Sequence, residues 1–112
     1  MYYEGLEGFS QDLPCTIKLE NDVLTITNQT TTAKLSIDQI TTIDTLAEEN
    51  FLVKYHNTSG TTAKMGTKFY YVIKYNSSNG EPKYIAFWDV RSKTMNYFLK
   101  LRAKIKPSEY NL

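Results

Sequence analysis

The chain has 112 residues and a formal net charge of +1, with 41% hydrophobic and 22% charged residues. This length and composition predict one domain, residues 1–112, that builds its own hydrophobic core. The near-neutral total charge argues against general nucleic-acid binding. A single cysteine, Cys15, excludes an internal disulfide and a cysteine-rich zinc site.

No apolar run approaches the ~20 residues of a membrane span, and the N-terminal residues lack the pattern of a signal peptide. We therefore expect a cytoplasmic protein.

The charges are unevenly divided along the chain. Residues 1–52 hold two lysines against nine acidic residues, a net of −7, whereas residues 53–112 hold eleven Lys and Arg against three acidic residues, a net of +8. The molecule is expected to be electrically polar.

Apolar and polar residues alternate in three early segments, as half-buried strands require: residues 15–20, 23–28 and 32–38. A tight turn at Asn21 and Asp22 joins the first two, so the three strands form a meander. A fourth strand is expected over residues 40–46. Ile40 and Ile43 break its alternation because they are three residues apart, a spacing that favours a bulge.

The middle of the chain is interpreted as a turn at residues 47–50, a fifth strand at residues 51–55 and a long polar loop at residues 56–67. Two segments rich in aromatic and β-branched residues follow, at residues 68–75 and 83–89. The Asn79-Gly80 pair between them is a turn signal, so these two segments predict a hairpin.

The hydrophobic period then changes to that of a helix over residues 91–106. Asp89 or Ser92 is the expected N-cap. The apolar face of this helix is expected to comprise Met95, Phe98, Leu99, Leu101 and Ile105. On the opposite face, the helical spacing brings together Lys93, Lys100 and Lys104, with Tyr97 at the edge.

The order of these elements resembles the pleckstrin-homology-like (PH-like) fold. The apolar patterns of Gly5-Leu6 and of residues 13–19, 33–40, 70–75 and 84–87 look like those of small bacterial and phage PH-like proteins of unknown function. The resemblance implies a mainly β (α+β) protein, a partly open seven-stranded barrel of two antiparallel sheets capped by one C-terminal α-helix. Members often carry a Gly- and Ala-rich insertion where this chain has the polar residues 56–67.

We find no catalytic, cofactor-binding or metal-ligating motif in the sequence, and expect no enzyme activity and no cofactor. His56 is the only histidine, and it becomes a general base only if a distant carboxylate or nucleophile converges on it. The adjacent Glu48 and Glu49 do not predict a carboxylate pair. Cys15 is interpreted as a small buried hydrophobe.

Two further features bear on ligands. PH domains that bind phosphoinositides carry basic residues near the first hairpin turn, where this chain has Asn21-Asp22, so we expect no such site. Tyr70, Tyr84 and Trp88 are expected on one face of the last hairpin, where we interpret them as barrel core rather than as a platform for nucleic-acid bases.

Three functions remain open. The first is a non-enzymatic module that binds an unknown protein or peptide at a sheet edge, in a groove between residues 51–55 and the terminal helix. The second is weak binding to an anionic membrane surface, without stable anchoring, through Lys93, Tyr97, Lys100 and Lys104. The third is self-assembly, with the acidic half of one copy against the basic half of the next.

Overall fold

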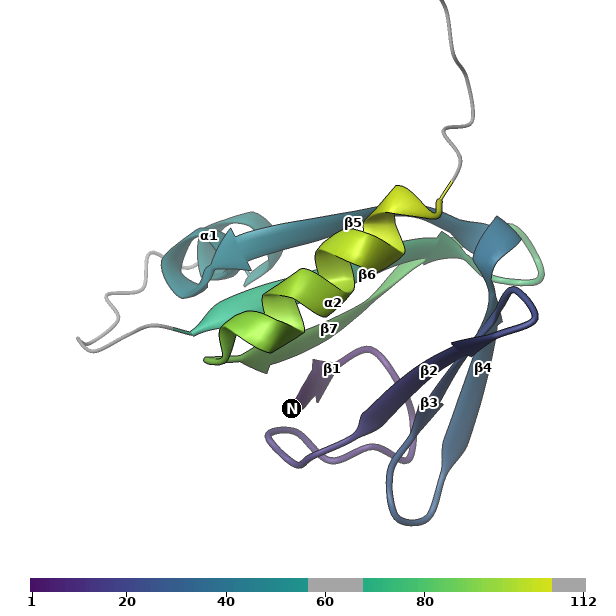
Figure 1. The fold of residues 1–112 in the computed structure, drawn as a ribbon, viewed down its shortest axis with the longest axis horizontal. Helices are drawn as coiled ribbons and strands as arrows, with labels where there is room; N and C mark the ends of the chain where they lie inside the picture. Colours follow the sequence, from purple (N-terminus) through teal and green to yellow (C-terminus); the bar gives the residue numbers. More distant parts are fainter. Residues whose placement is uncertain (57–67, 106–112) are drawn as a thin grey trace, which may run out of the picture.

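The computed structural model describes residues 1–56 and 68–105, which form two antiparallel β-sheets and two α-helices (Figure 1). The four-stranded sheet has the order β1-β7-β6-β5 and comprises β1 (Tyr2–Glu4), β5 (Ile40–Ala47), β6 (Phe69–Asn76) and β7 (Pro82–Asp89). The three-stranded sheet comprises β2 (Thr16–Glu20), β3 (Val23–Thr27) and β4 (Thr32–Ser36). The two sheets are not closed on each other. The α+β class expected from the sequence is confirmed.

The early meander is confirmed, with β2 paired to β3 and β3 to β4. Asn21 and Asp22 make its first turn, and both have positive φ angles, 53° and 63°. The third strand is shorter than expected, because residues 37–39 form a 3₁₀ helix. Ser36 and Gln39 cap this helix in a capping box: the Ser36 hydroxyl accepts from the backbone N–H of Asp38, and the Gln39 side-chain oxygen accepts from the backbone N–H of Ser36.

The predicted bulge in β5 is also confirmed, because the pairing of β5 with β6 shifts register between Ile40 and Thr42. An extra residue at this point lets Ile40 and Ile43 both reach the core, where they are 5% and 0% exposed. The last hairpin is confirmed too, and β6 and β7 pair along their whole length.

The predicted turn at residues 47–50 and the predicted strand at residues 51–55 are wrong. Ala47 ends β5, and the chain continues directly into helix α1 (Glu48–His56). Phe51 and Tyr55 are four residues apart, so both a strand and a helix would bring their rings to one face. Only a helix turns Val53 away from that face, and Val53 is 56% exposed. The remainder of the predicted loop, residues 57–67, lies outside the described residues.

The short strand β1 was not predicted, since three residues carry no detectable alternation. Its pairing with β7 joins residues more than eighty positions apart, Tyr2 opposite Phe87 and Glu4 opposite Ala86. Gly5 follows β1 with a φ of +114°, and a Cβ there would lie 2.3 Å from the carbonyl oxygen of Tyr84. Glycine is required at this close approach to β7.

Two apolar layers cover the two faces of the four-stranded sheet. The main core lies between this sheet, the three-stranded sheet and helix α2 (Ser92–Ala103), and its buried residues include Leu24, Ile26, Ile73, Phe87 and Phe98. A second cluster on the other face holds α1 against the sheet. Its buried residues are Phe51, Tyr70, Val72 and Ala86. Successive residues of β6 therefore serve opposite layers.

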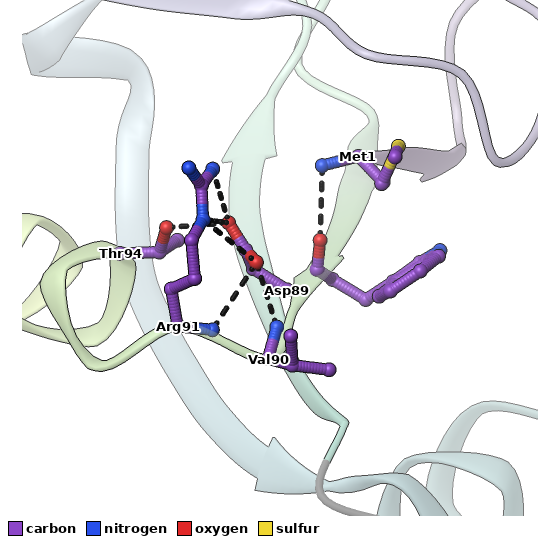
Figure 2. A network of polar contacts seen from close by, with 6 residues as sticks. Met1, Asp89, Val90, Arg91 and Thr94 are labelled. Carbon is purple, nitrogen blue, oxygen red and sulfur yellow. Dashed lines mark hydrogen bonds and ion pairs between the residues drawn. The ribbon is translucent and has the colours of Figure 1, made fainter.

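Asp89 closes the connection from β7 to α2 (Figure 2). The N-cap is Arg91, so neither expected residue occupies that position. Asp89 nevertheless organises the helix start, because its carboxylate accepts hydrogen bonds from the Thr94 hydroxyl at 2.6 Å, the backbone N–H groups of Val90 and Arg91, and the Arg91 guanidinium. Burial alone raises the pKa of Asp89, but these hydrogen bonds outweigh it and hold the pKa well below its ordinary value.

The helix ends earlier than expected, at Ala103, and the predicted helical residue 106 lies outside the described residues. Phe98 and Leu101 are buried, and Met95 and Ile105 are partly buried against the main core, as expected for the apolar face. Leu99 departs from the prediction, because it is 46% exposed. It lies outside the buried face of α2.

Candidate functional site

The lysines predicted as a surface are all exposed on α2 and at its C-cap. Lys93, Lys100 and Lys104 form no ion pair with any described residue. Tyr97 is 36% exposed, and its ring meets the ring of Phe98 edge-on at 5.6 Å. The structure therefore brings the four predicted residues together on α2 and its C-cap, with three positive charges that no described acidic residue compensates.

The groove expected between residues 51–55 and the terminal helix does not exist. Phe51 of α1 packs on Tyr70, whereas Phe98 of α2 packs on Tyr71, the next residue of β6. Neighbouring residues of a strand point to opposite faces, so α1 and α2 cover opposite faces of the sheet. The strand that lies beside α2 at the edge of the four-stranded sheet is β5 instead.

β5 presents one unpaired backbone edge. Among the described residues it pairs only with β6, so its other edge has no strand partner. Thr45 lies opposite Tyr71 in the ladder, on the face that α2 covers. Its hydroxyl oxygen is buried and makes no hydrogen bond with the described residues. A buried hydroxyl without a partner costs about 1–3 kcal/mol in the free protein.

The outer face beneath α1 is a cluster that sequence reasoning missed. Tyrosine hydroxyls from this layer donate to three carboxylates: Tyr55 to Asp44, Tyr70 to Glu48 and Tyr84 to Glu4. Burial, then the neighbouring carboxylate, raises the pKa of all three tyrosines above the ordinary value. The hydroxyls stay protonated and donate these hydrogen bonds at every physiological pH.

Each of these carboxylates also has a basic partner. Lys54 lies 3.0 Å from Asp44, Lys68 lies 3.5 Å from Glu48, and His56 lies 2.8 Å from Glu4. The sequence did contain one signal for helix α1. Acidic residues lie in its first turn and basic residues in its last turn, an order that the helix dipole favours.

His56 is at the end of α1 and not in a loop. The carboxylate of Glu4 converges on it from more than fifty residues away, which sequence spacing does not reveal. No described serine, threonine or cysteine is hydrogen-bonded to His56. The contact fastens the end of α1 to β1.

Tyr70, Tyr84 and Trp88 share one face, as expected, but this face belongs to the outer layer. Phe51 stacks on Tyr70 with ring centroids 4.3 Å apart and an interplanar angle of 11°. The prediction that these rings form barrel core is therefore wrong, since α1 rather than the second sheet covers them. Trp88 donates to Asp12 at 2.7 Å, and Lys68 lies 4.3 Å from its ring.

The described part of the chain holds no group of three or more His, Cys, Asp or Glu residues arranged to bind a metal ion. No helix among the described residues is long and apolar enough to span a membrane. A scan against protein-family models, a search of curated proteins and a search of solved structures each found no match for this chain.

Proposed function

We propose that this chain is a non-enzymatic binding module that takes up an extended peptide segment of a partner protein along the free edge of β5. The PH-like resemblance of its element order is part of this proposal, because strand addition beside a terminal helix suits such an arrangement. The observation that carries the proposal is the backbone edge of β5 beside α2, which has no strand partner among the described residues. The buried, unpartnered hydroxyl of Thr45 lies on the α2 side of the same strand.

Two further features support peptide binding at this edge. β5 has eight residues, which is long enough for a ladder of several backbone hydrogen bonds. Leu99 leaves an apolar side chain exposed on α2, four residues after the partly buried Met95, where a helix places both on one flank. A peptide laid along β5 is expected to supply alternate side chains, one polar for Thr45 and others apolar for α2.

Selection of peptides from a displayed random library against the immobilised protein tests this proposal. We expect the enriched peptides to perturb the amide resonances of β5 and α2 on titration. Failure to enrich any peptide, or perturbations confined to another surface, contradicts it.

A Thr45→Val variant sharpens the test. Valine keeps the shape of threonine and removes the unpartnered hydroxyl, so we expect the free protein to be more stable by up to about 1 kcal/mol. The same variant is expected to bind the selected peptide roughly fivefold more weakly, because the hydrogen bond to the ligand is lost. Thr25→Val, on the central strand β3 of the other sheet, is the matched control and is expected to leave peptide affinity unchanged.

A second candidate function is weak binding to an anionic membrane surface, favoured by the three lysines of α2 and its C-cap, which form no ion pair with a described residue. Lys93, Lys100 and Lys104 contribute about 3 kcal/mol near such a surface, a factor of roughly 100 in partitioning. Changing all three to glutamate is expected to abolish sedimentation with phosphatidylserine vesicles at low salt. The control changes three other exposed lysines, Lys18, Lys34 and Lys83, in the same way. Equal partitioning of the wild type and the α2 variant refutes this function.

A further inference from the structure

A cleft of about 660 Å³ opens between the loop of residues 8–14, the start of β2 and the turn that joins β3 to β4. Its volume lies within the ~300–1,000 Å³ typical of small-molecule sites. The cleft shares no residue with β5 or α2. It is therefore independent of the peptide-binding edge proposed above.

The walls of this cleft are mainly apolar and reach the main core. Phe9, Leu13, Pro14 and Cys15 line it, together with the buried ring of Tyr2. Tyr2 and Phe9 have ring centroids 5.3 Å apart, and both rings contact the core between the sheets. Leu13 is 55% exposed, which leaves a large apolar side chain at the mouth of the cleft.

Asn28 fixes the shape of the cleft by joining its two sides. Its side-chain nitrogen donates to the carbonyl oxygen of Gly8 at 3.1 Å, and its side-chain oxygen accepts from the backbone N–H groups of Thr30 and Thr31 at 2.9 and 2.6 Å. One side chain thus ties the N-terminal loop to the β3–β4 turn. The cleft is a built feature rather than a gap beside an unattached loop.

The charge in the cleft is of one sign. Lys18 is the only charged residue among those that line it, and it forms no ion pair with any described residue. The other polar groups in the lining are uncharged hydroxyls and amides, from Ser10, Thr16, Thr27, Asn28, Gln29 and Thr30. A negatively charged group gains from Lys18 and meets no carboxylate in the lining.

We propose that this cleft binds a small amphipathic anion, with its apolar body against Phe9, Leu13 and Pro14 and its charge toward Lys18. A medium-chain carboxylate has this chemistry. Its hydrocarbon chain is removed from water by the apolar walls, and its carboxylate meets the single positive charge.

Decanoate and decyltrimethylammonium, which pair the same hydrocarbon chain with opposite charges, test the proposal by calorimetry below their micelle concentrations. Cys15 reports the location of binding, because it is the only cysteine and lies in the wall of the cleft. Decanoate is expected to bind and to slow the reaction of Cys15 with N-ethylmaleimide in proportion to the occupied fraction. The ammonium compound is expected to do neither. Equal binding of the two compounds, or decanoate binding without protection of Cys15, overturns the proposal.

Two substitutions in the cleft, with one control outside it, test the charge preference and the location of the site. Lys18→Met is expected to weaken decanoate binding about threefold to fivefold. Lys34→Met removes an exposed lysine of the same sheet that does not line the cleft, and is expected to leave binding unchanged. Leu13→Glu places a carboxylate at the mouth and is expected to abolish binding. Circular dichroism verifies that each variant is folded. Wild-type affinity in Lys18→Met or in Leu13→Glu excludes this cleft as the site.

Discussion

Replacing Phe51 by alanine is expected to lower the free energy of unfolding by about 3–5 kcal/mol. The Phe51 side chain is 0% exposed and is the contact through which α1 packs on the sheet. It stacks on Tyr70 and Tyr55, at 4.3 and 5.2 Å between ring centroids, and meets Tyr3 edge-on at 5.5 Å. Its removal leaves a cavity lined by rings that cannot collapse onto one another.

Urea denaturation measures this loss, and hydrogen exchange locates it. The amides of α1 are expected to lose protection before those of the main core, because α1 has no other fully buried side chain. Val53→Ala is the matched control on the same helix, since Val53 is 56% exposed and its truncation is expected to change stability by less than about 0.5 kcal/mol. A loss below about 1 kcal/mol for Phe51→Ala contradicts the docking of α1 on this face.

The sequence was sufficient to predict the elements whose signals are local. Alternation in residues 16–20 and 23–27, the Asn79-Gly80 turn and the amphipathic pattern of residues 92–103 each depend on neighbours within one element. The bulge at Ile40 was predictable for the same reason. These elements define the three-stranded sheet, the last hairpin and α2.

Helix α1 was misread because its residues favour strands when considered singly. Phe51, Val53 and Tyr55 are aromatic or β-branched, and they occupy every second position, as one face of a strand would. Packing decides the matter, because Phe51 and Tyr55 lie on one helical face above Tyr70 and Tyr84. Tertiary burial of that pair outweighs the local preference.

The candidate sites divide in the same way. The lysines of α2 follow from helical spacing within one element, so the sequence predicts them. The edge position of β5, the convergence of Glu4 on His56 and the cleft beside Lys18 all depend on long-range pairing. Short strand β1 brings Glu4 beside β7, and Asn28 brings the N-terminal loop beside the β3–β4 turn. No local sequence pattern around Glu4 or Asn28 predicts which distant segment each of them contacts.

Replacing Asp89 by alanine is expected to destabilise the protein by about 2–4 kcal/mol. Asp89 is 8% exposed, and its loss leaves the Thr94 hydroxyl and the backbone N–H groups of Val90 and Arg91 without their acceptor. The Arg91 guanidinium is exposed and returns to water, so it adds little to this loss. Asp38→Ala, at an exposed aspartate in the 3₁₀ helix, is the control and is expected to cost less than about 0.5 kcal/mol.

The pH dependence of this loss tests its cause. Because the pKa of Asp89 is lower in the folded protein than in the unfolded chain, the ionised carboxylate stabilises the fold above the unfolded pKa of ~3.9. That stabilisation is lost progressively as the pH falls below about 4 toward the folded pKa. The difference in unfolding free energy between the wild type and Asp89→Asn is therefore expected to be constant from about pH 5 to 8 and to shrink on further acidification.

Denaturation by urea at a series of pH values from 7 to 3 measures that difference directly. Asp44 also has a lowered pKa, because the hydrogen bonds and charges of Tyr55, Lys54 and Lys74 outweigh the effect of its burial. Both proteins carry Asp44, so its titration cancels in the comparison. A difference that stays constant down to pH 3, or grows, shows that the carboxylate of Asp89 does not favour its ionised form. In that case the turn from β7 into α2 is held by packing alone.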